Sequence, residues 1–263
     1  MRKRFIQSHL GLVDQFLAPS RFLLERYVDW GIPRDKIRFE DYGRRPIHSR
    51  TRSRTRSRTR SRTRKRNRFA FFGQLSMFKG INVLLKAMNQ VAEAGVDAEL
   101  TVYGANLELQ PQDFRDEFAR LLDMTRGSVT FVGEYKHDDL PALMERADWV
   151  VVPSIWWENS PLVIQEAFMN GRPVICSDIG GMAEKVSNGV NGLHFTASNA
   201  ASLADTILAG VRTPGLWNQL RSGIPEVHSM QDHVRNLSQI YSQLLERRTG
   251  PQSELPELAQ AGG

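Results

Sequence analysis

The stretch Trp149-Val-Val-Val-Pro-Ser-Ile-Trp-Trp-Glu-Asn-Ser-Pro-Leu-Val-Ile-Gln-Glu-Ala167 contains the features that decide the fold. It begins with an apolar run of the length and character of a buried strand, and then passes through a more polar loop. Ser160 is a suitable helix N-cap and Pro161 suits the first helical position, so we expect a helix over 161–170. A strand that leads through a loop into a helix is the repeating unit of α/β folds.

The same alternation extends over residues 69–195, where short apolar runs take turns with stretches of helical periodicity. Apolar runs without a two-residue alternation indicate strands covered on both faces, and this order of elements gives a parallel sheet with right-handed crossovers. We therefore predict an α/β fold, a Rossmann-like domain with a doubly wound parallel sheet. The expected strands are 69–72, 99–103, 129–132, 149–152, 173–176 and 192–195; the expected helices are 79–94, 112–124, 138–146, 161–170 and 182–187, followed by 198–211, 216–222 and 230–247.

The residues before this domain follow a different pattern. An apolar run at 15–19 precedes Ser20, which should cap a helix that ends at Gly31, and a strand is expected at 37–42. One helix and two strands bury no core of their own, so we interpret them as the remnant of a larger domain. The expected organisation is a remnant at 1–43, a disordered linker at 44–67, the Rossmann-like domain at 68–228, a C-terminal helix at 229–248 and a flexible tail at 249–263.

The formal net charge of +6 is concentrated in one place. Ten Arg, one Lys and no acid lie between Arg50 and Arg68, which contributes +11 and leaves −5 for the rest of the chain. Arg alternates there with Ser and Thr and no apolar group is available for burial, so a solvated spacer is the first interpretation. The alternative is a polybasic arm attracted to nucleic acid or anionic lipid, with binding that weakens steeply with salt.

The remaining composition limits the cellular context. Cys176 is the only cysteine, so a disulfide within the chain is excluded and a reducing compartment is permitted. It lies in an apolar run at 173–177, which indicates an inert core thiol rather than a nucleophile. The basic residues Arg2–Arg4 are not followed by the apolar stretch of a signal peptide, and no apolar run approaches the ~18 residues of a membrane span. We expect no transmembrane segment and a cytoplasmic location.

The loop after the first expected strand, from Gly73 through Gln74 to Lys79 and Gly80, has features of an anion site. Gly73 permits a tight turn or a close approach to a ligand, and Lys79 stands at the start of a helix, where the helix dipole already favours an anion. A plain surface lysine is the competing explanation. The spacing matches neither the Walker A loop nor Gly-x-Gly-x-x-Gly.

The loop after the fourth expected strand carries a pair of carboxylates. Glu158 precedes the expected helix and Glu166 lies within it, and a carboxylate accepts two hydroxyl hydrogen bonds, as a ribose or hexose requires. The backbone N–H groups of Leu162 and Val163 would be available to phosphate oxygens. An ordinary helix start with one stray acid on each side remains the competing explanation.

Two further loops are weaker candidates. Gly180 and Gly181 follow the fifth strand, where they fit either a close ligand approach or a tight turn. Glu134 and Tyr135 follow the third strand and are placed to border a base, although a tyrosine there is as often part of the packing.

Taken together, these loops resemble the donor-binding domain of GT-B fold glycosyltransferases of family 4, glycosyl transferase group 1. The resemblance covers most of residues 69–195 and depends above all on Glu158-x7-Glu166 with Asn159-Ser-Pro-Leu162 between. It also includes Gly73-x-Leu-x3-Lys79-Gly80, Gly171-x-Pro-Val174, and Gly180-Gly181 followed by Glu184-x3-Asn188-Gly-x-Asn-Gly192.

The resemblance implies a role for each matching position. Glu158, the catalytic residue, would hold hydroxyls of the transferred sugar together with Asn159, and Glu166 would bind the ribose. The donor diphosphate would contact Gly73, Gln74 and Lys79, and the segment Ser160, Pro161, Leu162 and Val163. The resemblance implies neither a cofactor nor a divalent metal, so Lys79 and helix N–H groups would neutralise the leaving group. Glu134 and Tyr135 would lie beside the base.

The chain departs from the family pattern in two respects. Many relatives have Arg where this chain has Gln74, which forms hydrogen bonds but cannot cancel charge. The remnant at 1–43 would supply only the end of the first, acceptor-binding domain, and a separate chain is one candidate source of the rest of that domain. The segment Ala18-Pro-Ser-Arg-Phe22 resembles the family's usual sequence there.

The leading hypothesis is a retaining transfer of a sugar from a nucleoside diphosphate sugar to an unidentified acceptor. The alternatives are a truncated, non-catalytic nucleotide-sugar binder, a nucleic-acid-associated protein that acts through the Arg-rich tract, and a sugar-nucleotide epimerase on the same fold. We do not expect nucleic-acid binding, because no aromatic residues interleave the tract for base stacking.

Overall fold

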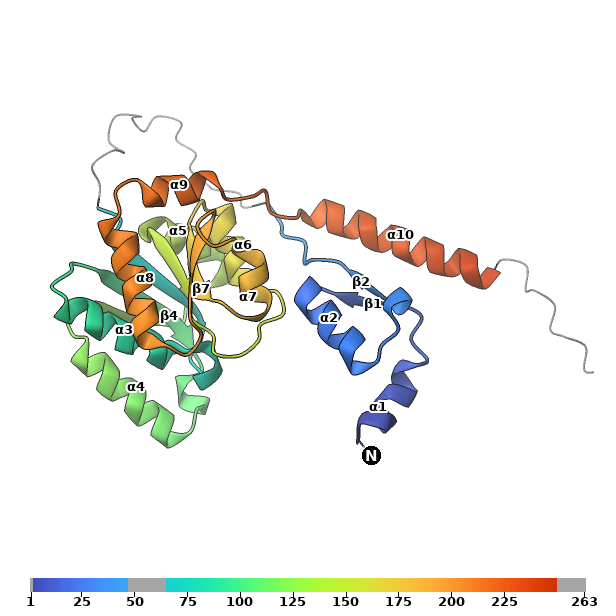
Figure 1. Cartoon of the computed structure of the whole chain (residues 1–263), viewed down its shortest axis with the longest axis horizontal. Coiled ribbons are helices and arrows are strands. Elements are labelled where there is room, and N and C mark those ends of the chain that lie inside the picture. The colour runs from blue at the N-terminus through green and yellow to red at the C-terminus, as the bar shows by residue number, and fades with distance from the viewer. Residues whose placement is uncertain (1, 47–64, 250–263) are drawn as a thin grey trace, which may run out of the picture.

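The computed structural model describes residues 2–46 and 65–249 (Figure 1). Its main unit is a six-stranded sheet in which every neighbouring pair of strands is parallel, in the order β5-β4-β3-β6-β7-β8. The order reverses between β3 and β6, so the predicted Rossmann-like, doubly wound sheet is confirmed. The strands are β3 (Arg68–Gln74), β4 (Glu99–Ala105), β5 (Val129–Gly133), β6 (Trp149–Val152), β7 (Val174–Ser177) and β8 (Gly192–Phe195).

Helices cover both faces of the sheet, and successive residues of β3 face opposite sides. Phe69 and Phe71 join the core under α3, α4, α8 and α9, whereas Ala70 and Phe72 join the core under α5, α6 and α7. The helices are α3 (Ile81–Glu93), α4 (Gln112–Met124), α5 (Leu140–Arg146), α6 (Leu162–Met169), α7 (Gly180–Lys185), α8 (Ala200–Arg212), α9 (Leu216–Ser222) and α10 (Met230–Thr249).

Strand β5 is an exception to the expectation that every strand is covered on both faces. It lies at the edge of the sheet, and its residues are exposed or half-buried, with Val132 54% exposed. An edge strand has a neighbour on one side only, and the helices here cover the centre of the sheet more fully than its border. β6 and β7, in the middle, are buried at every residue.

The thiol of Cys176 on β7 is buried, and burial raises its pKa above the ordinary value. Because only the thiolate reacts, we expect iodoacetamide at pH 8 to label the folded protein at least 100-fold more slowly than the urea-unfolded protein. Mass spectrometry of timed samples measures both rates. Comparable rates would mean that the thiol is accessible, against its assignment to the core.

Residues 2–46 form a small unit beside the domain. It contains α1 (Arg2–Leu10), β1 (Phe16–Ala18), α2 (Arg21–Trp30), a 3₁₀ turn at Arg34–Lys36 and β2 (Ile37–Phe39), which pairs in parallel with β1. Ser20 caps α2 by accepting from the N–H of Leu23, and Gly31 ends it with a left-handed φ of 115°, as predicted. Helix α1 was not predicted, since none of its residues is buried and no apolar face marks it.

The small unit is attached to the main domain at several points. The carboxylate of Glu184 on α7 accepts from the backbone N–H groups of Arg21 and Phe22 at 2.9 and 2.7 Å, so it caps the start of α2. Figure 1 shows α10 leaving the domain and running past β1 and β2, where Gln243 accepts a hydrogen bond from Arg38 at 2.9 Å.

Both ends of the expected linker belong to the folded structure. Arg44 at one end contacts the main domain, and Arg66 at the other lies 3.7 Å above the ring of Trp217. Asn67 is buried and donates to the carbonyl of Asp97 at 3.0 Å. The expectation of disorder at 44–67 is therefore wrong for 44–46 and 65–67, and its remainder, like the tail from residue 250, lies outside the described residues.

Candidate functional site

Three loops that follow β3, β6 and β7 meet at the carboxyl ends of the strands, beside the reversal in strand order. Two glycines permit this contact. A Cβ atom on Gly80 would lie 1.9 Å from the carbonyl oxygen of Pro153, and one on Gly181 would lie 1.9 Å from that of Asn159. The N–H of Gly181 also donates to the carbonyl of Glu158 at 2.7 Å. In doubly wound sheets, ligands bind at the carboxyl ends of the strands beside the reversal in strand order.

Lys79 and Glu158 meet where these loops touch, although 79 positions separate them in the sequence. The Nζ of Lys79 lies 2.6 Å from Oε1 of Glu158, which also accepts from the hydroxyl of Ser154 at 2.8 Å. Their side chains are 35% and 19% exposed, so the pair is partly shielded and still reachable by a ligand. The sequence singled out both residues but did not predict the direct ion pair.

The start of α6 lies immediately after this loop. Helix α6 begins at Leu162, with Pro161 in the cap position, so Ser160 does not cap the helix as expected. The hydroxyl of Ser160 donates instead to Asp41 at 2.9 Å, which is a long-range contact that local sequence does not encode. The N–H groups of Leu162 and Val163 are in the first turn, where no preceding helical carbonyl accepts from them.

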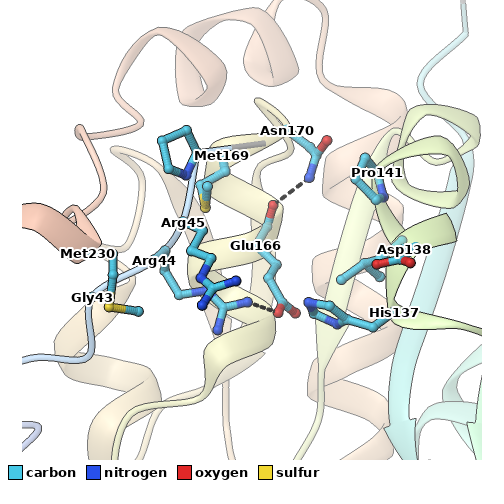
Figure 2. Close-up of a pocket in the computed structure, with 12 residues that line it drawn as sticks. Gly43, Arg44, Arg45, His137, Asp138, Pro141, Glu166, Met169, Asn170 and Met230 are labelled. Carbon is cyan, nitrogen blue, oxygen red and sulfur yellow. Dashed lines mark hydrogen bonds and ion pairs between the residues drawn. The ribbon is translucent and has the colours of Figure 1, made fainter. Parts of the chain in front are cut away.

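Glu166 lies within α6 and is 9% exposed. Its carboxylate forms an ion pair with Arg44 (Figure 2). Burial raises the pKa of the nearby Tyr135 phenol, and the negative charge of Glu166 raises that pKa further, so the Tyr135 hydroxyl stays protonated.

Glu166 opens into a cavity of about 510 Å³ between the small unit and the domain (Figure 2). Arg44 and Arg45 form one side, and His137 and Asp138 form the other. Neither Lys79 nor Glu158 lines this cavity.

A second cavity of about 480 Å³ lies between the ends of β4 and β5. Glu134 lines it together with Gly104, Asn106 and Gly133. Gln74 at the end of β3 and Asn159 in the loop after β6 are both exposed. Of the base-adjacent pair, Glu134 therefore opens onto a cavity, whereas Tyr135 packs edge-to-face against Phe72 with ring centroids 5.6 Å apart.

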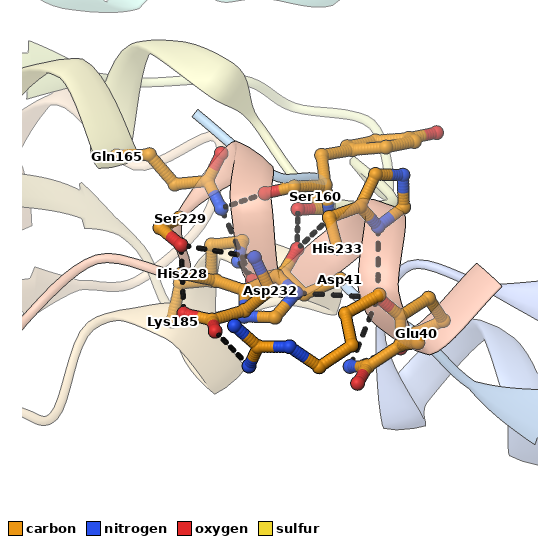
Figure 3. Close-up of polar contacts among 12 residues, drawn as sticks. Glu40, Asp41, Ser160, Gln165, Lys185, His228, Ser229, Asp232 and His233 are labelled. Atoms are coloured by element: carbon orange, nitrogen blue, oxygen red, sulfur yellow. Dashed lines mark hydrogen bonds and ion pairs between the residues drawn. The ribbon is translucent and has the colours of Figure 1, made fainter. Parts of the chain in front are cut away.

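Two residues that contact this region, Asp41 and Arg44, were not predicted from the sequence. The carboxylate of Asp41 accepts from Ser160, from Nε2 of Gln165 at 3.1 Å, and from Lys185 (Figure 3). Asp41 thus joins the small unit to α6 and α7, and Arg44 joins it to Glu166. Asp41 lies within the expected strand at 37–42 and Arg44 follows it, and neither position by itself indicates a contact with the site.

Comparisons with known proteins agree with this architecture. A profile of the family described as glycosyl transferases group 1 matches residues 66–212. The chain is 30% identical over 181 residues to an uncharacterized glycosyltransferase of Methanocaldococcus jannaschii, covering 67% of this chain and 45% of that protein. It is 28% identical over 190 residues to glycogen synthase of Mycobacterium tuberculosis, covering 71% and 45% respectively. The chain spans about half the length of these curated relatives.

Solved structures are similar over more of the chain. HepE of Anabaena, in complex with UDP and glucose, superposes with a TM-score of 0.74 at 20% identity, covering 92% of this chain and 67% of that one. Sucrose-phosphate synthase of Thermosynechococcus elongatus gives 0.75 at 23% identity, covering 94% and 62%. At these identities the likeness is one of fold.

No helix among the described residues is both long and apolar enough to cross a membrane.

Proposed function

Since the chain belongs to the glycosyl transferases group 1, we propose that its Rossmann-like domain binds a nucleoside diphosphate sugar and holds the sugar for transfer to an acceptor. The observation that carries this proposal is the Lys79–Glu158 ion pair in front of the first turn of α6, at the reversal in strand order. One cation, one carboxylate and a set of outward N–H groups match the chemistry of a glycosylated diphosphate.

The diphosphate would lie against Lys79 and the N–H groups of Leu162 and Val163. The negative charge that develops on the leaving diphosphate is then met by a fixed cation and by the positive end of a helix. Gln74 adds hydrogen-bonding capacity without charge, so Lys79 carries the main electrostatic role. No metal or cofactor enters this scheme.

Glu158 would accept hydrogen bonds from hydroxyls of the sugar once Lys79 turns toward phosphate. In a retaining transfer, the bond from the anomeric carbon to the diphosphate oxygen breaks and the bond to the acceptor oxygen forms on the same face of the sugar. The acceptor's proton passes to the leaving diphosphate, which balances the reaction without an added base. Ser154, which donates to Glu158 at 2.8 Å, would keep that carboxylate in position.

Glu166 would bind the ribose hydroxyls, and its replacement is the test of the nucleotide part of the proposal. We expect Glu166→Ala to weaken UDP binding about 10- to 150-fold, because each hydrogen bond to a charged acceptor contributes about 1.5–3 kcal/mol. Isothermal titration calorimetry of the full chain with UDP measures the change, and circular dichroism checks that the variant is folded.

The matched control is Glu145→Ala on α5, which removes an exposed carboxylate away from the loops of the site. It should leave UDP binding unchanged. Equal UDP affinity in the wild type and in a folded Glu166→Ala variant would contradict the assignment of Glu166 to the ribose.

A further inference from the structure

A second polar cluster lies outside the proposed donor site, where the small unit meets the start of α10 (Figure 3). It consists of Glu40, His228 and His233, and we call it the His–Glu cluster. One oxygen of Glu40, Oε1, lies 2.7 Å from Nδ1 of His233 and 3.2 Å from Nε2 of His228. Among the described residues it is the one group of His, Cys, Asp and Glu whose ligand atoms converge closely enough to hold a metal ion.

The donor set matches a particular class of metal. Two imidazole nitrogens and one carboxylate oxygen are ligands typical of zinc, and of neighbouring divalent transition metals, rather than of magnesium or calcium. The three ligand atoms all lie within 4.8 Å of one another. Ligands of a tetrahedral zinc ion stand about 3.4 Å apart, so small rotations of the side chains would bring them to bonding distance.

The surroundings hold the cluster in place. Asn236, one turn further along α10, donates to the second oxygen of Glu40 at 3.1 Å and so orients the carboxylate. The backbone is fixed as well, since the N–H of Arg44 donates to the carbonyl of His228 at 2.9 Å. A Cβ atom on Gly43 would lie 2.5 Å from the Cβ of His233, so the two segments are as close as a glycine permits.

The cluster is also accessible. The side chains of His228, His233 and Glu40 are 26%, 20% and 9% exposed, which shields the ligands while leaving a side open for an ion and a water molecule. A site with three protein ligands and one open position is a common zinc arrangement.

We propose that Glu40, His228 and His233 bind a zinc ion, with a water molecule as the fourth ligand. The ion joins the segment after β2 to the start of α10, and so fixes the small unit against the C-terminal helix. The cluster shares no residue with the loops after β3, β6 and β7, so we expect the ion to act on stability rather than on the donor site. The proposal does not depend on nucleotide binding.

The test uses the full chain without an affinity tag, treated with EDTA and dialysed. At zinc concentrations about 100-fold above Kd, we expect Tm to rise by about 5 °C and calorimetry to give one zinc per chain. Magnesium at the same concentration should leave Tm unchanged, since it prefers oxygen ligands. Metal analysis after gel filtration should recover one zinc per chain, a readout that does not depend on stability.

The double variant His228→Gln/His233→Gln should lose both the Tm rise and the retained zinc. The matched control is His9→Gln, which removes an exposed histidine of α1 and should keep both. An unchanged wild-type Tm together with no retained zinc would overturn the proposal. The same zinc content in the wild type and the double variant would also overturn it, by placing the metal elsewhere.

Discussion

Replacing Asp148 by alanine is expected to lower the free energy of unfolding by about 3–5 kcal/mol. The Asp148 side chain is fully buried in front of β6, and its carboxylate contacts Arg66 at 3.2 Å and Arg68 at 3.1 Å. It also accepts from the backbone N–H of Arg68 at 3.3 Å. Removing the carboxylate would leave two guanidinium groups and one backbone donor without their partner in a shielded site.

Urea unfolding followed by circular dichroism measures this change. Asp123→Ala is the matched control, because Asp123 pairs with Arg126 on the surface at 2.6 Å, with side chains 62% and 84% exposed. Exposed pairs of this kind contribute about 0.2–1 kcal/mol. A loss for Asp148→Ala no larger than the loss for Asp123→Ala would contradict a structural role for the buried carboxylate.

Gly80→Ala is expected to lower the free energy of unfolding by about 2–5 kcal/mol and to abolish measurable UDP binding. Gly80 has a left-handed φ of 69°, which disfavours a side chain, and the added Cβ would lie 1.9 Å from the carbonyl oxygen of Pro153. The backbone must therefore move where the loops after β3 and β6 touch. We expect this movement to separate Lys79 from Glu158.

The control for this variant is Gly95→Ala. Gly95 has a φ of 68°, nearly the same as that of Gly80, but its Cβ would meet nothing within 4 Å. It isolates the conformational effect, about 1–2 kcal/mol, and should leave UDP binding unchanged. If the two variants lose the same stability and keep the same affinity, the loop contact at Gly80 has no role in the site.

The sheet and its helices could be predicted because their signals are local. β6 and β8 begin and end where the apolar runs do, and the helices at 112–124 and 216–222 match the expected ranges. The degree of burial was less predictable. Val129–Gly133 has the same apolar character as the central strands but lies at an edge, and position in the sheet depends on how distant strands pair rather than on the strand's own sequence.

The candidate site was predicted in part for the same reason. Lys79 and Glu158 follow their own strands, so the general rule for parallel sheets places both at one edge. Ser160 was expected to cap α6, which is what a serine before Pro does when only local contacts count. The Ser160 hydroxyl donates instead to Asp41, which lies 119 positions earlier in the chain. No periodicity or spacing in the sequence encodes that pairing.

The ion pair between Arg44 and Glu166 makes two events compete for one carboxylate. If Glu166 binds ribose hydroxyls, a nucleotide that engages its carboxylate also breaks one of the contacts that hold the small unit. By thermodynamic reciprocity, if the ion pair of Arg44 lowers the nucleotide affinity by some factor, the bound nucleotide lowers the equilibrium constant for docking of residues 2–46 by the same factor. An empty donor site would then favour the docked position of the N-terminal segment.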